Sequence, residues 1–270
     1  MSSPTLGRVV FIGGGPGSAD LITVRGARLL ATADVVLFDA LTDPALRDFA
    51  PRARWLDVGK RGFCDSTGQA AIDALLVKMA QQHAVVVRLK GGDPSIFGRL
   101  EEELQALAAA GIASEVVPGV TAAIAAAAAT QRPLTRRGTG RSVSLTTAMS
   151  QSGELGAGRH ADTEVFYMAG RQLGKLGRAL RAAGWPLNTP VCVVSRAGWP
   201  DCMASSHVLA DLAAASVLHA GRPTVVTVGV GAAAVPGVTA GVTTAASTTA
   251  ATEKTLPHDP AQSGHTRLTP

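Results

Sequence analysis

Aromatic residues are scarce in this 270-residue sequence, and Tyr167 is its single tyrosine. The net charge is +5, yet no block of basic residues concentrates it. Grooves that bind single-stranded nucleic acid combine positive charge with stacking aromatic side chains. Nucleic acid is therefore not an expected partner, and the excess charge favours a small polyanionic substrate instead.

Cysteines are also few. Cys64, Cys192 and Cys202 are odd in number and show no C-x-x-C spacing. A disulfide framework or a structural zinc site needs paired cysteines. We therefore expect no metal and a reducing, cytoplasmic environment.

Long apolar runs are absent. The longest, Ala122 to Ala129, falls well short of the ~20 residues that a membrane-spanning helix needs. Residues 1–7, "MSSPTLG", have no charged segment typical of a signal peptide. We expect a flexible N-terminus and no membrane association.

Strand-like and helix-like patterns alternate along the chain. Short apolar runs predict strands at 9–12, 35–38, 55–58, 85–89, 115–117, 142–147, 164–168, 190–195 and 223–229. Helical periodicity predicts helices within 20–33, 69–82, 171–184 and 208–220. This alternation is typical of parallel sheets with helical crossovers.

The patterns divide the chain into segments. We expect a flexible N-terminus over 1–7, an N-terminal α/β lobe over 8–130, and an arginine-rich linker over 131–141. A C-terminal α/β lobe follows over 142–235. The segment 236–270 is rich in Thr, Ala and Pro with few large apolar residues, which predicts a disordered tail.

The first strand leads into the glycine-rich loop "GGGPG", residues 13–17. It fits neither the dinucleotide-binding pattern G-x-G-x-x-G nor a P-loop. Pro16 restricts Gly15, and Gly17 is free to adopt positive φ. The loop therefore suits either a ligand at the C-terminal edge of the sheet or a tight strand-to-helix turn.

A second glycine loop, "KGGDPSIFGR" over 90–99, follows another predicted strand. Asp93 can accept hydrogen bonds from a ligand, or it can form an Asx-turn before Pro94. In the third such stretch, "VVPGVTAAIAA" over 116–126, Thr121 is placed to cap a helix whose alanines allow close packing.

These stretches resemble the tetrapyrrole methyltransferase family from Arg8 to about Gly231. The resemblance also rests on "ADVVLFDAL" (33–41), "VGKRG" (58–62), "PLTRRG" (133–138), "VFYM" (165–168) and "SRAGWPDC" (195–202). It implies an α/β fold of two lobes, each a mostly parallel sheet flanked by helices, with the active cleft between the lobes.

The resemblance further implies that S-adenosylmethionine binds in that cleft, in a protein that is usually a homodimer. The cofactor contacts carried over by motif are Pro16, Gly91, Gly92, Asp93, Ile96, Thr121, Ala122, Met168, Ala197 and Thr224.

The activity implied is C-methylation of uroporphyrinogen III in two successive methyl transfers, at positions 2 and 7, giving precorrin-2 via precorrin-1. Asp39 holds the family's proton-acceptor position, and Lys60 holds that of the proton donor. The same residues also suit a turn cap and a solvated lysine.

Uroporphyrinogen III carries many carboxylates, which guanidinium groups bind with two parallel hydrogen bonds. The arginines expected to hold it are Arg61, Arg99, Arg132, Arg136, Arg137 and Arg141. Ser95 and Ile96 depart from the common pattern, which leaves two alternatives: a methyltransferase for a later precorrin or cobalt-precorrin, or a non-catalytic tetrapyrrole-binding relative.

Overall fold

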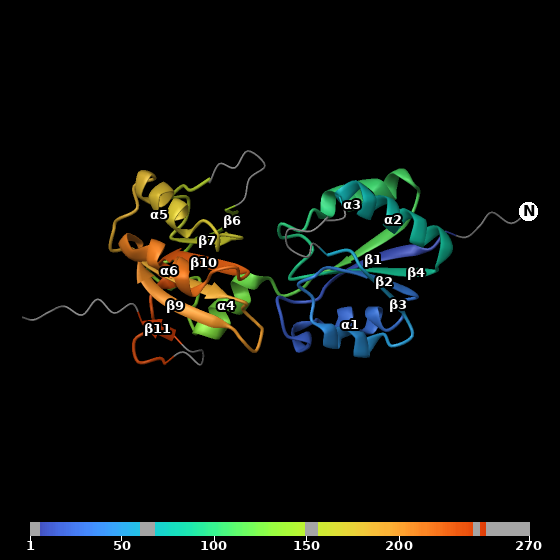
Figure 1. Ribbon diagram of the computed structural model, residues 1–270, viewed down its shortest axis with the longest axis horizontal. Coiled ribbons are helices and arrows are strands. Elements are labelled where there is room, and N and C mark those ends of the chain that lie inside the picture. The colour runs from blue at the N-terminus through green and yellow to red at the C-terminus, as the bar shows by residue number, and fades with distance from the viewer. Residues whose placement is uncertain (1–5, 60–67, 149–155, 240–243, 247–270) are drawn as a thin grey trace, which may run out of the picture.

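A computed structural model describes residues 6–59, 68–148, 156–239 and 244–246. The chain forms two lobes that lie side by side, each built around one sheet (Figure 1). The α-helices are α1 (Val24–Leu30), α2 (Gln69–Gln82), α3 (Leu100–Ala109), α4 (Ala122–Thr130), α5 (Leu173–Ala182) and α6 (Ala215–Leu218). Short 3-10 helices occupy Ala19–Leu21, Pro44–Phe49, Leu209–Ala214 and Val230–Ala232.

The first sheet is entirely parallel, with the strand order β3-β2-β4-β1-β5. Its strands are β1 (Arg8–Gly13), β2 (Val35–Phe38), β3 (Arg54–Asp57), β4 (Val85–Lys90) and β5 (Ala113–Val117). Each strand lies within about two residues of its predicted position. The prediction of a parallel sheet with helical crossovers is confirmed for this lobe.

Both faces of the first sheet are buried, as expected for parallel strands covered by crossover helices. Along β1, Val9 and Phe11 face the cluster that includes α2 and α3. Val10 and Ile12 face the opposite cluster, which includes Leu30 of α1. Figure 1 shows α1 on one side of the sheet and α2 with α3 on the other.

The strand order places a switch point between β1 and β4. The chain leaves β1 toward β2 on one side, and it leaves β4 toward β5 on the other. The loops after these two neighbouring strands therefore diverge at the C-terminal edge of the sheet. In open α/β sheets such a gap is where ligands bind.

The second sheet is mixed, with the order β11-β9-β8-β10-β7-β6. Its strands are β6 (Val143–Thr147), β7 (Thr163–Tyr167), β8 (Pro190–Ser195), β9 (Met203–Val208), β10 (Thr224–Gly229) and β11 (Thr244–Ala246). Strand β10 runs antiparallel to β7 and β8, and β8 runs antiparallel to β9. The expectation of a mostly parallel sheet is wrong for this lobe. Between β8 and β9, the short link over 196–202 allows a hairpin but not a parallel crossover.

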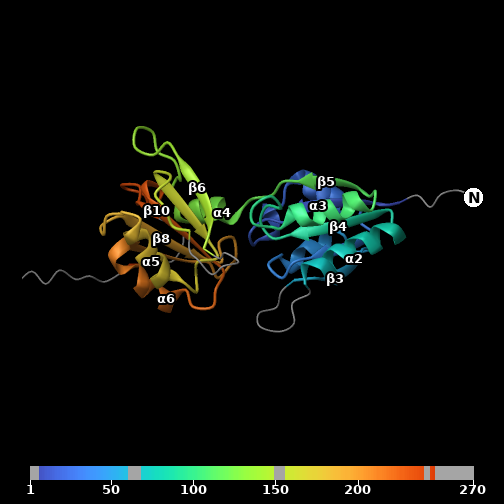
Figure 2. The same ribbon diagram turned by 90° about the horizontal axis from the view of Figure 1, so that it is seen from above.

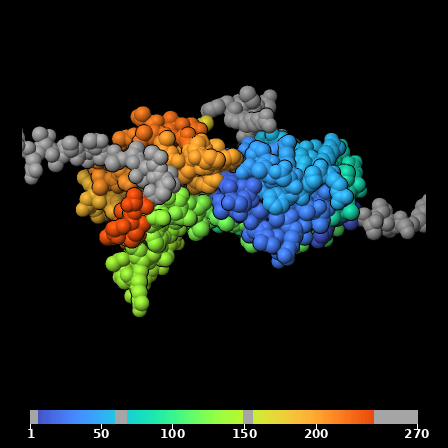
Figure 3. Space-filling model, turned by 90° about the horizontal axis from the view of Figure 1, so that it is seen from below, coloured from blue at the N-terminus to red at the C-terminus, as the bar shows by residue number. Residues whose placement is uncertain are grey.

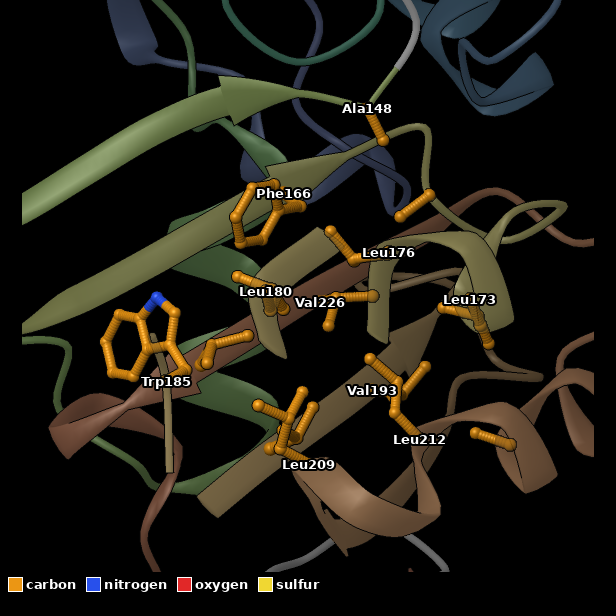
Figure 4. Close-up of a cluster of buried hydrophobic side chains, with 14 residues drawn as sticks. Ala148, Phe166, Leu173, Leu176, Leu180, Trp185, Val193, Leu209, Leu212 and Val226 are labelled. Atoms are coloured by element: carbon orange, nitrogen blue, oxygen red, sulfur yellow. The ribbon is translucent and has the colours of Figure 1, made fainter. Parts of the chain in front are cut away.

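The second lobe's main core lies between this sheet and α5, α6 and the Leu209–Ala214 turn. Leu173, Leu176 and Leu180 of α5 are fully buried because they recur on one helical face. Figure 4 shows them packed over Phe166 and Val226 of the sheet.

Helix α4 packs on the other face of the second sheet. Its buried residues Ala123, Ala125 and Ala126 join a cluster with Val194 and Val225. The sequence placed this helix in the lobe 8–130, whereas its packing assigns it to the second lobe. A polyalanine helix has no polar face, so its sequence does not indicate which of its sides is buried or against which lobe. The boundaries of the two lobes stay a proposal.

The ends of the chain are described only in part. Gly7 donates a backbone hydrogen bond to Ala80. In the segment 236–270, predicted to be disordered, Thr244–Ala246 instead pair in parallel with Ala204–Ser206 of β9. The rest of the tail beyond 239, like 1–5, lies outside the described residues. Among the described helices, none is long and apolar enough to cross a membrane.

A chain of polar side chains crosses the second lobe. His219, fully buried, lies 2.9 Å from Ser195 Oγ through Nδ1 and 2.8 Å from Ser205 Oγ through Nε2. Arg222 donates to the same Ser195 hydroxyl. Burial, with the charges of His207 and Arg222, lowers the pKa of His219 from 6.5 to about 4.

This depressed pKa predicts a pH dependence of stability. Because folded His219 binds a proton less tightly than in the unfolded chain, its contribution is complete above pH 6.5 and is lost as the pH falls toward 4. We expect His219 to cost about 2 kcal/mol of unfolding free energy between pH 7 and pH 5. Urea unfolding of the natural protein and of His219→Gln at both pH values measures this, and a constant difference between the two proteins would contradict it.

Candidate functional site

A cleft lies where the C-terminal edge of the first sheet meets the second lobe. Its empty volume is about 850 Å³ when the open mouth is included. From the first lobe and the connection to α4 it is lined by Pro16, Leu41, Gly91, Gly92, Asp93, Ile96, Phe97, Thr121 and Ala122. From the second lobe it is lined by Tyr167, Met168, Val194, Arg196, Ala197, Trp199, Pro223, Thr224 and Val225.

Three glycine loops meet at this edge through their main chains. Gly15 and Gly92 exchange two backbone hydrogen bonds, with N–O distances of 3.3 and 2.7 Å. A Cβ on Gly13 would lie 2.6 Å from Gly119 Cα, so no side chain fits there. Gly15 has φ +80°, whereas Gly17, which is free to adopt positive φ, does not do so. The loop adopts this turn because Gly15 must curve back to pair with Gly92.

Gly17 has a different role, at the contact between the lobes. A Cβ there would lie 2.4 Å from the carbonyl carbon of Gly198 and 2.8 Å from Trp199. The next residue, Ser18, donates its backbone N–H to Gly198 O at 2.7 Å. The lobes therefore touch directly over the cleft, through a pair of glycines.

Asp93 connects two of the three loops. Its Oδ1 accepts from Ser95 N–H at 2.8 Å, which is the Asx-turn that the sequence left open. Its Oδ2 accepts from Gly119 N–H, also at 2.8 Å. Because a carboxylate has further lone pairs, Asp93 can stabilise the loops and still accept a hydrogen bond from a ligand in the cleft.

Tyr167 caps helix α4 from the second sheet. Thr121 occupies the N-cap position, but its side chain makes no capping bond, contrary to prediction. Its Oγ1 lies instead 2.7 Å from Tyr167 Oη, which accepts from Ala123 N–H at 3.3 Å. Burial raises the pKa of the Tyr167 hydroxyl, so it stays neutral. The Tyr167 ring also packs edge-on against Phe97 of the first lobe, 5.1 Å between centroids.

The cleft concentrates strained backbone. Among the described residues, five that are not glycine have positive φ: Phe97, Met168 and Arg196 line the cleft, Arg99 lies close by in sequence, and Gln131 ends helix α4 away from the cleft wall. Such conformations cost energy and persist where the surrounding structure enforces them, often at ligand sites. These backbone conformations direct side chains that follow β4, β7 and β8 toward the cleft.

All ten residues predicted to contact the cofactor lie on the wall of this single cleft. Their binding role stays a prediction, but the structure brings them together from distant parts of the chain. Sequence reasoning missed other lining residues, among them Phe97, Tyr167, Arg196 and Trp199. All four lie within the motifs that carry the family resemblance. Taking each motif over its full length, rather than at selected positions, would have identified them.

Asp39 follows β2 at the same edge of the first sheet, two residues before Leu41 of the cleft wall. Its Oδ1 accepts from Arg88 Nη2 at 2.6 Å. None of the described residues donates a hydrogen bond to its Oδ2, and the side chain is 30% exposed. Asp39 thus lies beside the cleft with one carboxylate oxygen free of described partners.

Two predicted residues, Lys60 and Arg61, lie outside the described residues. Within the described ranges, no group of three His, Cys, Asp or Glu side chains is placed to hold a metal ion.

Arg132, expected to bind substrate, is buried inside the second lobe instead. Its Nη1 donates to Ala232 O at 2.7 Å and its Nη2 donates to Ser206 Oγ at 2.6 Å. The expectation is wrong, because the guanidinium already bonds main chain and side chain of its own lobe.

Arg136, Arg137 and Arg141 do not line the cleft, and their substrate-binding role stays a prediction. Arg136 bonds Ala233 O, and Arg141 N–H bonds Asp162 just before β7, at the end of the second sheet away from the cleft. Arg137 and Arg141 are exposed. Figure 3 shows this segment, in light green, projecting from the second lobe. An arginine-rich linker gives no sequence signal for which edge of the sheet it follows.

Among the described arginines, Arg196 lines the cleft, and Arg99 follows the cleft residue Phe97 by two positions. Arg196 stacks 4.4 Å above the Trp199 ring and pairs with Asp201. Arg99 is half-exposed beside Phe97 and pairs with Glu102 through two hydrogen bonds of 2.8 and 2.5 Å.

The fold and the cleft define a two-lobed α/β protein with a ligand site at a sheet switch point. Residues 8–213 match the family of Tetrapyrrole (Corrin/Porphyrin) Methylases. The chain belongs to this family, and the predicted two-lobed α/β class is confirmed.

Three relatives illustrate the similarity. A uroporphyrinogen-III C-methyltransferase of Pseudomonas aeruginosa is 44% identical over 195 residues, 71% of this chain and 80% of the relative. A uroporphyrin-III C-methyltransferase of Thermus thermophilus, solved with S-adenosylhomocysteine, has 34% identity and a TM-score of 0.73 over 83% of this chain and 97% of that one. A cobalt precorrin-4 methyltransferase has 30% identity and a TM-score of 0.72, covering 84% and 96%. The chain also matches siroheme synthases, of which it spans less than half the length.

The burial of Arg132 predicts a stability effect. Replacing Arg132 with Met leaves Ala232 O and Ser206 Oγ without their donor, so we expect a loss of about 2–4 kcal/mol of unfolding free energy. Urea unfolding measures this. The matched control, Arg137→Ala on the exposed surface, changes stability by at most about 0.5 kcal/mol. A stable Arg132→Met protein would contradict the structural role.

Proposed function

We propose that this protein transfers methyl groups from S-adenosylmethionine to uroporphyrinogen III, twice in succession, and releases S-adenosylhomocysteine. One observation supports this most: all ten residues assigned to the donor by motif line one cleft between the lobes. The named activity of the Pseudomonas relative and the ligand of the Thermus structure point the same way.

The cleft has the features that a nucleoside with an amino-acid tail needs. Gly91 and Gly92 leave their main chain bare, and Gly92 has φ +73°, which no side chain favours. Asp93 and Thr121 offer hydrogen-bonding groups, while Ile96, Ala122 and Val225 supply an apolar wall. We propose that these residues hold the methyl donor.

S-adenosylmethionine supplies, when bound, a methyl group on a positively charged sulfur. The contribution of the protein is mostly alignment of reactants. The Gly17–Gly198 contact closes the lobes over the cleft and limits the entry of water. Asp39, with its Oδ2 free of described partners, is placed to accept the proton that the substrate carbon loses on methylation.

The mouth of the cleft suits a large ring with acidic arms. Leu41, Phe97 and Met168 are exposed apolar side chains around it, which can pack against a flat macrocycle. Arg99 and Arg196 supply guanidinium groups for carboxylates. We propose these two, with Arg61, as the substrate-binding arginines.

We also propose a homodimer in the cytoplasm. Val116 of edge strand β5, Ile124 of α4 and Leu145 of edge strand β6 are exposed apolar residues, and Figure 2 shows all three elements on its upper side. Apolar side chains exposed on one side of the molecule are available to an interface between subunits. The described cysteines, Cys192 and Cys202, are free thiols, as in reducing compartments.

The proposed function is tested by incubating pure protein anaerobically with S-adenosylmethionine and uroporphyrinogen III. We expect S-adenosylhomocysteine release and a product heavier by two methyl groups, by mass spectrometry. Methylation of a later precorrin or cobalt-precorrin alone would favour the activity named for the cobalt precorrin-4 relative. Binding of S-adenosylmethionine without turnover on any of these substrates would favour a non-catalytic relative.

The role of Asp39 predicts a selective loss of turnover. Asp39→Asn keeps the size of the side chain but cannot take a proton, so kcat falls by about 10²–10⁴-fold. The affinity for S-adenosylhomocysteine, measured by calorimetry, stays unchanged because Asp39 does not line the cleft. If Asp39→Asn has the same kcat as the natural protein, the proton-acceptor role of Asp39 is refuted.

The contact between the lobes predicts an effect on donor affinity. Gly17→Ala places a methyl against Gly198 and Trp199, which forces the lobes apart and weakens S-adenosylhomocysteine binding by about tenfold or more. Calorimetry measures the affinity. The control is Gly68→Ala, whose Cβ meets nothing within 4 Å and which is not among the residues that line the cleft. Equal affinity of the two variants would contradict the closure.

A further inference from the structure

Four charged side chains form a connected cluster beneath the second glycine loop. Arg88 and Lys90 belong to β4, Glu103 belongs to α3, and Asp39 follows β2. Arg88 is 3% exposed and Glu103 is fully buried. Buried charges are costly unless they are paired with opposite charges. This cluster therefore carries a cost of desolvation, and it lies beside the candidate active site.

Arg88 is the centre of the cluster. Its Nε donates to Glu103 Oε1 at 2.8 Å, and its Nη2 donates to Asp39 Oδ1 at 2.6 Å. Its Nη1 donates to the backbone carbonyl of Leu89 at 3.2 Å. The planar guanidinium is therefore held on three sides, and its direction toward Asp39 is determined by Glu103 and the main chain of β4.

Glu103 is held in turn by two cations. Its second oxygen, Oε2, accepts from Lys90 Nζ at 2.6 Å. Two positive and two negative groups thus alternate in the order Lys90, Glu103, Arg88, Asp39. Only Asp39, at the end of the series, reaches solvent, with its side chain 30% exposed.

We infer that Arg88 and Glu103 are positioning residues for Asp39, which they hold with one carboxylate oxygen bound and the other without a donor among the described residues. The inference rests on the proposed function, in which Asp39 accepts the proton. Arg88 fixes Asp39 directly, and Glu103 acts one step further away by fixing Arg88. Neither residue lines the cleft.

The geometry explains why β4 carries charge where apolar residues are expected. Arg88 and Lys90 alternate with Val87 and Leu89, so both charged side chains leave the strand on the same face, toward Glu103 of α3. A parallel strand with both faces covered is ordinarily apolar throughout. A well-packed apolar pair would fill the same space at a lower cost of desolvation. The cluster therefore has a use beyond packing.

The test uses Arg88→Lys, which keeps the charge but cannot donate to Glu103 and Asp39 at once. We expect kcat with uroporphyrinogen III to fall by about 10–100-fold because Asp39 is misplaced. The affinity for S-adenosylhomocysteine and the KM for S-adenosylmethionine stay unchanged, since the donor wall does not include the cluster. A fall in affinity that matches the fall in kcat would indicate a general structural role and overturn the inference.

A double-mutant comparison shows whether Arg88 acts through Asp39. The protein with both Asp39→Asn and Arg88→Lys is expected to turn over no more slowly than Asp39→Asn alone. Multiplicative losses would mean that Arg88 acts independently, and the inference would be wrong. If Arg88→Lys does not fold, Glu103→Gln replaces it in the same comparison, with the same expected dependence on Asp39.

Lys90→Met is the matched control. This substitution removes a cation of the same cluster, and that cation contacts Glu103 but not Asp39. We expect lower stability with kcat close to that of the natural protein, and a loss as large as in Arg88→Lys would overturn the inference. Slow turnover by Asp39→Asn together with natural turnover by Arg88→Lys would refute this inference and leave the proposed function standing. No S-adenosylhomocysteine release by the natural protein refutes the proposed function itself.

Discussion

Direct contact between main chains at the C-terminal edge of the first sheet is the constraint on which this structure depends. Gly13 and Gly119 approach so closely that neither tolerates a Cβ, and Gly15 pairs with Gly92 through backbone hydrogen bonds. Because the loops after β1, β4 and β5 pack directly against one another through their main chains, they form a single platform. The bare main chain of that platform is what remains available to a ligand at the switch point.

The second lobe completes the site by adding side chains to that platform. Tyr167 caps α4 through its hydroxyl and contacts Phe97 through its ring, so one residue links the second sheet, the alanine helix and the second glycine loop. Met168 and Arg196 follow their strands in positive-φ conformations. The first lobe thus contributes backbone and the second contributes the enclosing surface, which explains why the cleft needs both.

Charge is distributed in two distinct ways. Buried charges such as Arg88, Glu103 and Arg132 are bonded within the protein and set the position of other groups. Arg196 of the cleft wall and Arg99 near it in sequence have carboxylate partners yet remain accessible. Because exposed ion pairs exchange partners at low cost, these arginines can release Glu102 and Asp201 in favour of an acidic substrate. The net charge alone does not distinguish the two groups.

The sequence by itself determined the parallel first sheet, the helices α2 and α5, and ten of the residues that line the cleft, because these follow from local periodicity and from motifs with fixed spacing. Only the tertiary structure decided the antiparallel pairing of β10, the lobe on which α4 packs, and the separation of Arg132 and Arg136 from the cleft. A strand's partner and an arginine's direction depend on residues distant along the chain. Those long-range contacts leave no periodic pattern in the sequence, and they exist only once the two sheets have packed.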